Sequence, residues 1–251
     1  RGVGEQLMPT PLCLQGIRQL SHRRTASVLL PLLRVEGTVG EAYECDAAAE
    51  VESLLRQYGQ LVMKSPWSSS GRGLRFLDVG RTPFSMQARW FHNVVAAQGS
   101  VMVEPYYHKV KDFGMEFTSD GKGGITYLGL SLFHTANGAY TGNILATEQT
   151  KLGMISSYLP TALLDNVREK ICSRLSTVFD GRYCGPFGID MMVCASPHDA
   201  DGFLLHPCVE INLRRTMGHA ALELSPDDDD LTAVMRIDYT DNYYKLRINR
   251  L

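Results

Sequence analysis

The stretch Val209-Glu210-Ile211-Asn212-Leu213-Arg214 alternates apolar and polar residues, which is typical of a strand with one buried face. Side chains alternate faces along a strand, so Glu210, Asn212 and Arg214 share one face. A carboxylate beside a carboxamide offers the hard oxygen ligands that Mg²⁺ prefers. The planar fork of an Arg can clamp a phosphate or a carboxylate. An ordinary half-exposed strand with a polar face explains the same alternation, so the stretch alone leaves both interpretations open.

Asp190 is the single acid of Phe187-Gly188-Ile189-Asp190-Met191-Met192-Val193, an otherwise apolar stretch that predicts a strand. No basic residue is near it in the sequence, and a buried carboxylate is costly unless it is paired or bound to a metal. A strand with Asp190 next to the strand with Glu210 and Asn212 would assemble a divalent-ion site. The isolated acid therefore favours the metal interpretation.

A Ser/Gly-rich loop, Lys64-Ser65-Pro66-Trp67-Ser68-Ser69-Ser70-Gly71-Arg72-Gly73, connects two expected strands. Small residues let backbone N–H groups turn inward around an anion, and Lys64 can place a charge on a phosphate. The loop is not a Walker A motif, because Gly-x-x-x-x-Gly-Lys-[Ser/Thr] is absent from the chain. An exposed hairpin tip rich in turn formers is the competing interpretation.

A third feature is the strand Val101-Met102-Val103-Glu104-Pro105-Tyr106-Tyr107, followed by Asp112. A strand that relaxes after Glu-Pro leaves backbone groups that could bind the edge of a base, and Asp112 could accept hydrogen bonds from ribose hydroxyls. An ordinary strand end fits the same residues.

Taken in order, these motifs resemble the ATP-grasp superfamily, whose members join a carboxylate to an amine or similar nucleophile through an acyl-phosphate. The resemblance extends from Ser21 to His219 and depends most on the isolated Asp190 followed by Glu-x-Asn-x-Arg-x-Thr-x-Gly. It implies an α+β fold with two lobes of mainly antiparallel sheets that clasp the nucleotide. We expect a lead-in segment over 1–35, a smaller lobe over 36–98 and a larger lobe over 99–251.

The resemblance also implies a role for individual residues. Arg214 and Lys64 would be catalytic, and Asp190, Glu210 and Asn212 would hold Mg²⁺. Arg23 stands where family members usually have Lys, so its role follows least directly. Residues expected to bind the nucleotide are Arg23, Lys64, Ser68, Ser69, Ser70, Gly71, Gly73, Glu104, Tyr107 and Asp112.

The predicted activity is that of an ATP-dependent ligase that requires Mg²⁺, with two ions expected and Mn²⁺ as a substitute, and that forms a carbon–nitrogen bond. Its substrates would be a small-molecule carboxylate and an amine. Arg215 and His219 could line the acceptor site or be solvated neighbours. Two alternatives stay open: a kinase that phosphorylates a hydroxyl, and a regulatory module that binds ATP without catalysis.

Composition limits the remaining classes. The chain has 251 residues, a net charge of −2 and 44% hydrophobic residues, which argues against nucleic-acid binding and against disorder. No apolar run reaches the roughly 18 to 20 residues of a membrane span. Six irregularly spaced cysteines predict a reduced, cytoplasmic protein. The start at Arg1 leads us to expect an upstream domain of the same protein, and a homo-oligomer is compatible with the sequence.

Hydrophobic periodicity predicts an α+β class with antiparallel sheets rather than an alternating βα series. Helices are expected over 17–33, over 47–58 with Asp46 as N-cap, over 83–98, over 160–179 and after Thr216. Strands are expected over 41–45, 61–64, 74–79, 100–107, 113–119, 125–133, 140–146, 187–195 and 203–213, and from Leu231 onward.

Overall fold

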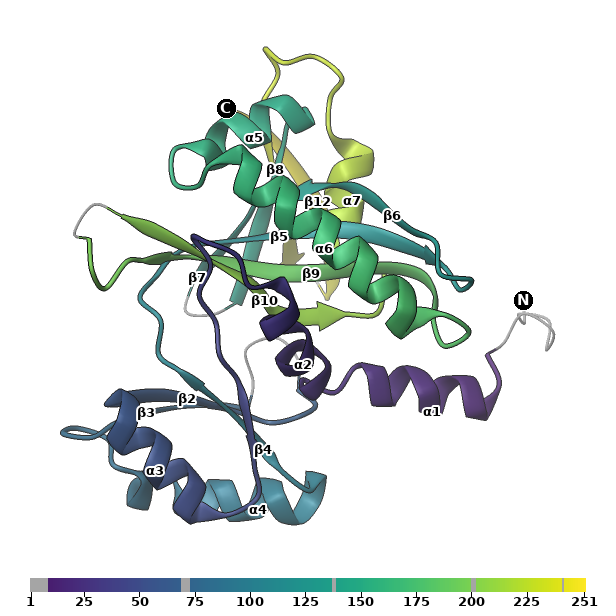
Figure 1. The fold of residues 1–251 in the computed structure, drawn as a ribbon. Helices are drawn as coiled ribbons and strands as arrows, with labels where there is room; N and C mark the ends of the chain where they lie inside the picture. The colour runs from purple at the N-terminus through teal and green to yellow at the C-terminus, as the bar shows by residue number, and fades with distance from the viewer. Residues whose placement is uncertain (1–8, 69–72, 137–138, 200–201, 241) are drawn as a thin grey trace.

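A computed structural model describes residues 9–68, 73–136, 139–199, 202–240 and 242–251. These residues form three four-stranded sheets, in which every strand pairing is antiparallel, together with the helices that cover them (Figure 1). The predicted α+β class with mainly antiparallel sheets is therefore confirmed.

The smaller sheet has the strand order β1-β4-β2-β3. Its strands are β1 (Tyr43–Cys45), β2 (Gln60–Lys64), β3 (Leu74–Asp78) and β4 (Val101–Pro105). Two helices, α3 (Ala48–Tyr58) and α4 (Ala88–Gln98), pack against it, and a short 3-10 helix, η2 (Phe84–Met86), precedes α4. The core between them is built around Leu61, Met63 and Phe91, all fully buried.

The central sheet has the order β10-β9-β5-β6 and contains the longest strands. These are β5 (Lys109–Asp120), β6 (Ile125–Ser131), β9 (Cys184–Ala195) and β10 (Phe203–Asn212). One face is covered by α2 (Arg24–Leu33) and α6 (Thr161–Phe179), which bury Leu33 and Ile171 in the largest core. The opposite face is therefore the one on which polar side chains can gather.

The third sheet has the order β12-β11-β8-β7. Its strands are β7 (Phe133–Ala136), β8 (Ala139–Leu145), β11 (Ala233–Thr240) and β12 (Tyr243–Arg250). α7 (Met217–Leu224) follows β10 and packs between this sheet and the central one, where Ala221 meets Leu145 and Met235. α5 (Glu148–Ser156) follows β8 and was not predicted from the sequence.

The expected single helix over 17–33 is wrong. The chain forms α1 (Pro11–Leu20), breaks, and resumes as α2. The Ser21 hydroxyl donates a hydrogen bond to the carbonyl of Ile17, and the imidazole Nδ1 of His22 accepts one from the backbone N–H of Arg24. These local bonds end one helix and begin the next, so the intervening Arg23 is turned toward the central sheet.

Two smaller corrections concern the first half of the chain. Asp46 does not cap α3, because the helix begins at Ala48 and Ala47 occupies the N-cap position. The Glu50 carboxylate accepts from the backbone N–H groups of Asp46 and Ala47 instead. β4 pairs with β1 and β2, so the smaller sheet includes residues on both sides of the expected boundary at position 98. The division into 1–35, 36–98 and 99–251 stays a prediction.

Candidate functional site

Glu210 and Asp190 stand directly opposite each other on the neighbouring strands β10 and β9, and Asn212 stands opposite Gly188. The amide Nδ2 of Asn212 donates to Oδ2 of Asp190 over 3.0 Å. Burial, followed by repulsion from the Glu210 carboxylate, raises the pKa of Asp190 to about 7. Three oxygen-bearing side chains thus gather on one face of the central sheet, with two carboxylates that repel each other.

The local cause of this register is an irregularity in β10. His206 pairs with Met192, whereas Glu210 pairs with Asp190, so four residue steps on β10 span two on β9. Pro207 lies in this interval and cannot donate a ladder hydrogen bond, which is where bulges form. The extra two residues leave His206 and Glu210 on the same face.

Arg23 connects this face with the Ser/Gly-rich loop. Its Nη2 lies 3.0 Å from Oε2 of Glu210, and its Nη1 donates to the carbonyl of Ser65 and the hydroxyl of Ser68, each over 2.9 Å. The Arg23 side chain is buried, and its Nε has no hydrogen-bond partner among the described residues. One guanidinium therefore holds the start of the loop against the acidic strand.

The base of the loop is closed by a hydrogen bond from the backbone N–H of Ser65 to the carbonyl of Gly73 over 2.9 Å. Gly73 has φ +75°, and a Cβ there would lie 2.8 Å from the Ser65 hydroxyl, so glycine is required for both reasons. Ser69, Ser70 and Gly71 lie outside the described residues. Of the predicted loop contacts, the structure thus places Ser68 and Gly73.

Trp67 anchors the described part of the loop on α1. Its indole Nε1 donates to the carbonyl of Arg18 over 2.9 Å, and the guanidinium of Arg18 lies 4.5 Å from the ring centroid. The His22 ring packs edge-on against the same indole at 4.5 Å. These contacts indicate that Trp67 anchors the loop on α1.

Lys64, at the end of β2, is paired with Glu104 on β4. The ammonium donates to the carboxylate over 2.6 Å, and both side chains are about nine-tenths buried. The register places Glu104 opposite Val62, so the two side chains meet diagonally across the strand pair. Lys64 and Glu104, both predicted to bind the nucleotide, are therefore direct neighbours.

Tyr107 follows β4 where the chain passes from the smaller to the central sheet. Its hydroxyl accepts from the backbone N–H of Glu41 over 2.9 Å, and its ring lies edge-on against His206 at 5.3 Å. His206 is fully buried, with no hydrogen-bond partner for either ring nitrogen among the described residues. Burial lowers the pKa of His206 to about 4, so the ring is neutral. Sequence reasoning missed this His.

Asp112 has partners of its own at the start of β5. It accepts from the ammonium of Lys109 over 2.6 Å and from the hydroxyl of Thr135 over 2.7 Å. Asp112 is opposite Met192 on β9. Met192 is two residues from Asp190, so Asp112 and Asp190 lie on the same face of the sheet. The sequence predicted this carboxylate but not the Lys that neutralises it.

Arg214 lies just beyond β10, is exposed, and donates to the amide Oδ1 of Asn212 over 3.2 Å. Nearby, the buried Glu116 of β5 faces His219, whose Nδ1 lies 2.9 Å from Oε2 of Glu116, within ion-pair distance but without hydrogen-bond geometry. Burial lowers the pKa of His219, but Glu116 and the carbonyl of Phe117 outweigh it, so the pKa is raised. Glu116 also raises the pKa of Asp190, which ties this pair electrostatically to the acidic strand.

The donor set fits a divalent cation. Asp190, Glu210 and Asn212 provide carboxylate and amide oxygens, and the raised pKa of Asp190 marks two carboxylates that Arg23 and Arg214 only partly neutralise. Among the described residues no three His, Cys, Asp or Glu side chains converge as metal ligands, so the amide of Asn212 is needed to complete the set.

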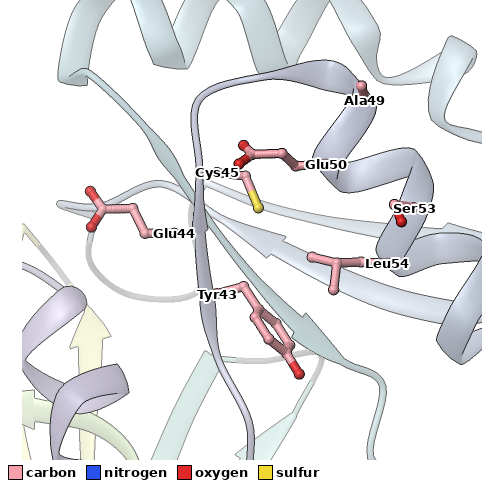
Figure 2. Close-up of a pocket in the computed structure, with 7 residues that line it drawn as sticks. All are labelled: Tyr43, Glu44, Cys45, Ala49, Glu50, Ser53 and Leu54. Atoms are coloured by element: carbon pink, nitrogen blue, oxygen red, sulfur yellow. The ribbon is translucent and has the colours of Figure 1, made fainter.

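A pocket of about 480 Å³ lies elsewhere, between β1 and α3 (Figure 2). It is lined by Tyr43, Glu44, Cys45, Ala49, Glu50, Ser53 and Leu54. No residue predicted for the site lines it, and burial raises the pKa of the Cys45 thiol to about 12, so this thiol is not a ready nucleophile. The pocket is therefore not part of the candidate site.

Comparisons with known proteins support the fold. No family model matches the chain, and no curated protein matches it in sequence. N5-carboxyaminoimidazole synthetase from Staphylococcus aureus, complexed with ADP, is 12% identical with a TM-score of 0.56, over 91% of this chain and 59% of that one. Biotin carboxylase from Campylobacter jejuni is 13% identical with a TM-score of 0.63, over 91% of this chain and 53% of that one.

A third structure, the biotin carboxylase domain of the Hydrogenobacter thermophilus 2-oxoglutarate carboxylase, is 13% identical with a TM-score of 0.61, over 90% of this chain and 52% of that one. These neighbours are ATP-grasp enzymes, so the chain has the ATP-grasp fold that its motifs predicted. It spans between 52% and 59% of their lengths.

Proposed function

We propose that this chain is the nucleotide-binding catalytic part of an ATP-dependent ligase that activates a carboxylate as an acyl-phosphate for attack by an amine. The observation that carries the proposal is the juxtaposition of Asp190, Glu210 and Asn212 on facing strands with Arg23, which joins Glu210 to the Ser/Gly-rich loop. The fold, shared with ATP-grasp enzymes, supports the same activity.

Asp190, Glu210 and Asn212 would hold Mg²⁺. Bound there, the ion would neutralise phosphate oxygens and orient the nucleotide. A cation held by these residues would offset the repulsion between the facing carboxylates of Asp190 and Glu210, which adds to burial in raising the pKa of Asp190. The number of ions, and the use of Mn²⁺, are part of the proposal.

Cationic side chains would bind the phosphates from the opposite side. ATP carries about four negative charges, and a carboxylate cannot approach its γ-phosphate until these are offset. Lys64 lies directly before the loop, and Arg23 fixes the loop at Ser65 and Ser68. The Lys64 ammonium is paired with Glu104, so nucleotide binding would replace or extend this buried pair.

Arg214 is the cation best placed to act on the transferring group. It is exposed beyond β10, and its bond to Asn212 orients it toward the acidic face. We assign to it the stabilisation of the transferring phosphoryl group or of the acyl-phosphate. Glu104 and Tyr107 would meet the base through their backbone, and Asp112 the ribose, each from the segment that connects the two sheets.

The wider setting follows the same proposal. The substrates would be a small-molecule carboxylate and an amine. An upstream domain of the same protein would complete the sites that bind them. No helix of the described residues is long and apolar enough to cross a membrane. All six cysteines are free thiols, which supports a reducing compartment such as the cytoplasm.

Binding is tested first, by the thermal shift that Mg-ATP produces. A ligand that binds the folded state stabilises it by roughly 2.7 kcal/mol at 100 times its Kd. We expect a clear upward shift of Tm in the parent chain, its loss in Glu210→Gln, and its retention in Glu52→Gln, an exposed site on α3. A shift that survives Glu210→Gln unchanged contradicts the metal assignment.

The reaction is tested in the full-length protein by ADP release against panels of carboxylates and amines. With an ¹⁸O-labelled carboxylate, the acyl-phosphate route transfers label into phosphate. Turnover that depends on an alcohol and leaves phosphate unlabelled would identify a kinase instead. Binding without turnover against every panel would favour the regulatory module.

A further inference from the structure

β11 and β12 form a two-stranded ribbon that extends beyond the third sheet. β8 pairs with β11 only over Ala233–Met235, whereas β11 and β12 pair from Ala233–Arg250 to Thr240–Tyr243. Beyond Met235, therefore, each strand of the ribbon pairs only with the other among the described residues. The two faces of this outer part must each meet solvent or a partner.

From Met235 and Ile248 outward, one face of the ribbon is entirely apolar or aromatic, while Arg250 lies opposite Ala233 at the base of the same face. The register pairs Met235 with Ile248, Ile237 with Leu246 and Tyr239 with Tyr244, and directly opposed residues lie on the same face. Met235 at the base is fully buried against α7 and β8. The other five are exposed to between 40% and 76%, with Tyr244 the most exposed. The apolar face of the ribbon thus begins in the core beneath α7 and extends from there onto the surface.

Over the same outer stretch the opposite face is polar and carries all the charges, from Arg236 and Arg247 onward. Arg236 opposes Arg247, Asp238 opposes Lys245, and Thr240 opposes Tyr243. Arg247 forms an ion pair with Asp238 over 2.7 Å, and the Lys245 ammonium lies 4.6 Å from the Tyr243 ring centroid. This separation of apolar and charged side chains onto opposite faces is typical of a sheet that buries one face. A ribbon with both faces in solvent does not require it.

The exposed apolar area is large enough for an interface between two copies. Taking roughly 200 Å² for each of these large residues when fully exposed, their exposed fractions give about 500–600 Å² for the five. That equals the largest patches of typical monomers, about 300–600 Å². Two such faces in contact would bury roughly 1,000–1,200 Å², which meets the lower limit of a specific interface.

Charge distinguishes the ways in which two copies can meet. Pairing two β12 edges would bring Lys245 and Arg247 of one copy beside the same cations of the other, and β12 has no acid to offset them. Packing the apolar faces outward from Met235 and Ile248 brings no charged side chain of that stretch into the contact. An uncharged face is self-complementary, as a two-fold symmetric contact requires.

We propose that the apolar face of the β11–β12 ribbon, formed by Ile237, Tyr239, Tyr244, Leu246 and Ile248, packs against the same face of a second copy of this chain. The contact makes a symmetric dimer through stacked ribbons. It does not depend on the proposed ligase activity, because it involves none of the residues assigned to the site.

The test is the mass of the chain in solution, measured by sedimentation velocity over a range of concentrations. We expect a reversible species of twice 27.9 kDa. Neighbouring tyrosines provide a matched pair of variants, because Tyr244 lies on the apolar face and Tyr243 on the charged face, and both are exposed. Tyr244→Glu would bury a carboxylate from each copy, so we expect the dimer Kd to rise by at least about tenfold. Tyr243→Glu should leave it unchanged.

Tyrosine-selective chemical labelling of the unmodified chain provides a second readout that needs no variant. Reactivity of Tyr244 should fall severalfold as the dimer forms, while that of Tyr243 stays constant. A chain that is monomeric at all concentrations overturns the proposal, and in the full-length protein that result would show that another segment covers the ribbon. A dimer that both variants leave intact, or in which Tyr244 stays reactive, overturns it as well.

Discussion

Replacing Arg23 with alanine should destabilise the fold far more than replacing its neighbour Arg24, although both form ion pairs. Arg23 is buried and contacts three groups: the Glu210 carboxylate at 3.0 Å, and the Ser65 carbonyl and Ser68 hydroxyl at 2.9 Å. Arg24 forms a two-pronged pair with Glu44, but its side chain is 54% exposed. The same substitution thus removes a buried contact at one position and a solvated contact at the next.

The magnitude follows from burial. Breaking a buried ion pair costs about 3–5 kcal/mol, because the remaining charge is left without compensation. The Glu210 side chain is 30% exposed, so water recovers part of that loss, and alanine also removes the Nε atom that has no described partner. We therefore expect Arg23→Ala to lower the free energy of unfolding by about 2–3 kcal/mol, whereas exposed pairs contribute about 0–1 kcal/mol.

The assay is urea denaturation of the parent chain and the two variants, followed by far-UV circular dichroism. For a domain of this size, about 2–3 kcal/mol corresponds to a fall in Tm of roughly 5–10 °C. Adding Glu210→Gln to Arg23→Ala should restore part of the loss, since the uncompensated carboxylate is then gone. Equal losses for Arg23→Ala and Arg24→Ala would refute the bridging role of Arg23.

Three further predictions concern other buried features. Lys64→Met strands the buried Glu104 carboxylate and should cost about 3–5 kcal/mol in urea denaturation, while Lys64→Met/Glu104→Leu should recover most of it. Gly218→Ala would place a Cβ 1.8 Å from a carboxylate oxygen of the buried Glu116, so we expect the free energy of unfolding to fall by about 1–3 kcal/mol. Gly16→Ala in α1 has nothing within 4 Å of the new Cβ, so the free energy of unfolding should rise by about 0.5–1 kcal/mol. The pKa of His206 is lowered from 6.5 to about 4, so the unfolded chain binds the extra proton and stability falls as the pH drops through this window, by about 3 kcal/mol. His206→Phe should remove that part of the pH dependence of unfolding; an identical profile for the variant and the parent chain would disprove it.

The sequence predicted the strands and the acidic face because alternation is a local signal. Asp190 and Glu210 were recognisable as partners, since an unpaired acid in an apolar strand needs a cation. The break between α1 and α2 was missed because apolar residues at helical spacing lie on both sides of the basic cluster at 22–24, a pattern that predicts one continuous helix. The bonds of Ser21 and His22 that end the first helix depend on side-chain geometry.

The partners of the site residues could not be predicted in this way. Arg23 meets Glu210 from 187 positions away, and Lys64 meets Glu104 across a strand pair whose register is set by the whole smaller sheet. His206 and Glu116 gave no local signal, because a polar residue in a strand is ambiguous until its neighbours are known. Contacts between distant segments were thus inaccessible, whereas residue types and their spacing were informative.

The irregular register of β10 limits how this gene region can change in length. Two extra residues between His206 and Glu210 keep both side chains on one face, because their partners Met192 and Asp190 lie two residues apart on β9. Insertion or deletion of a single residue in this interval would instead turn Glu210 and Asn212 toward the core and bring Ile211 out of it. Natural relatives should therefore vary here by even numbers of residues, whereas the loop before β10 can vary freely.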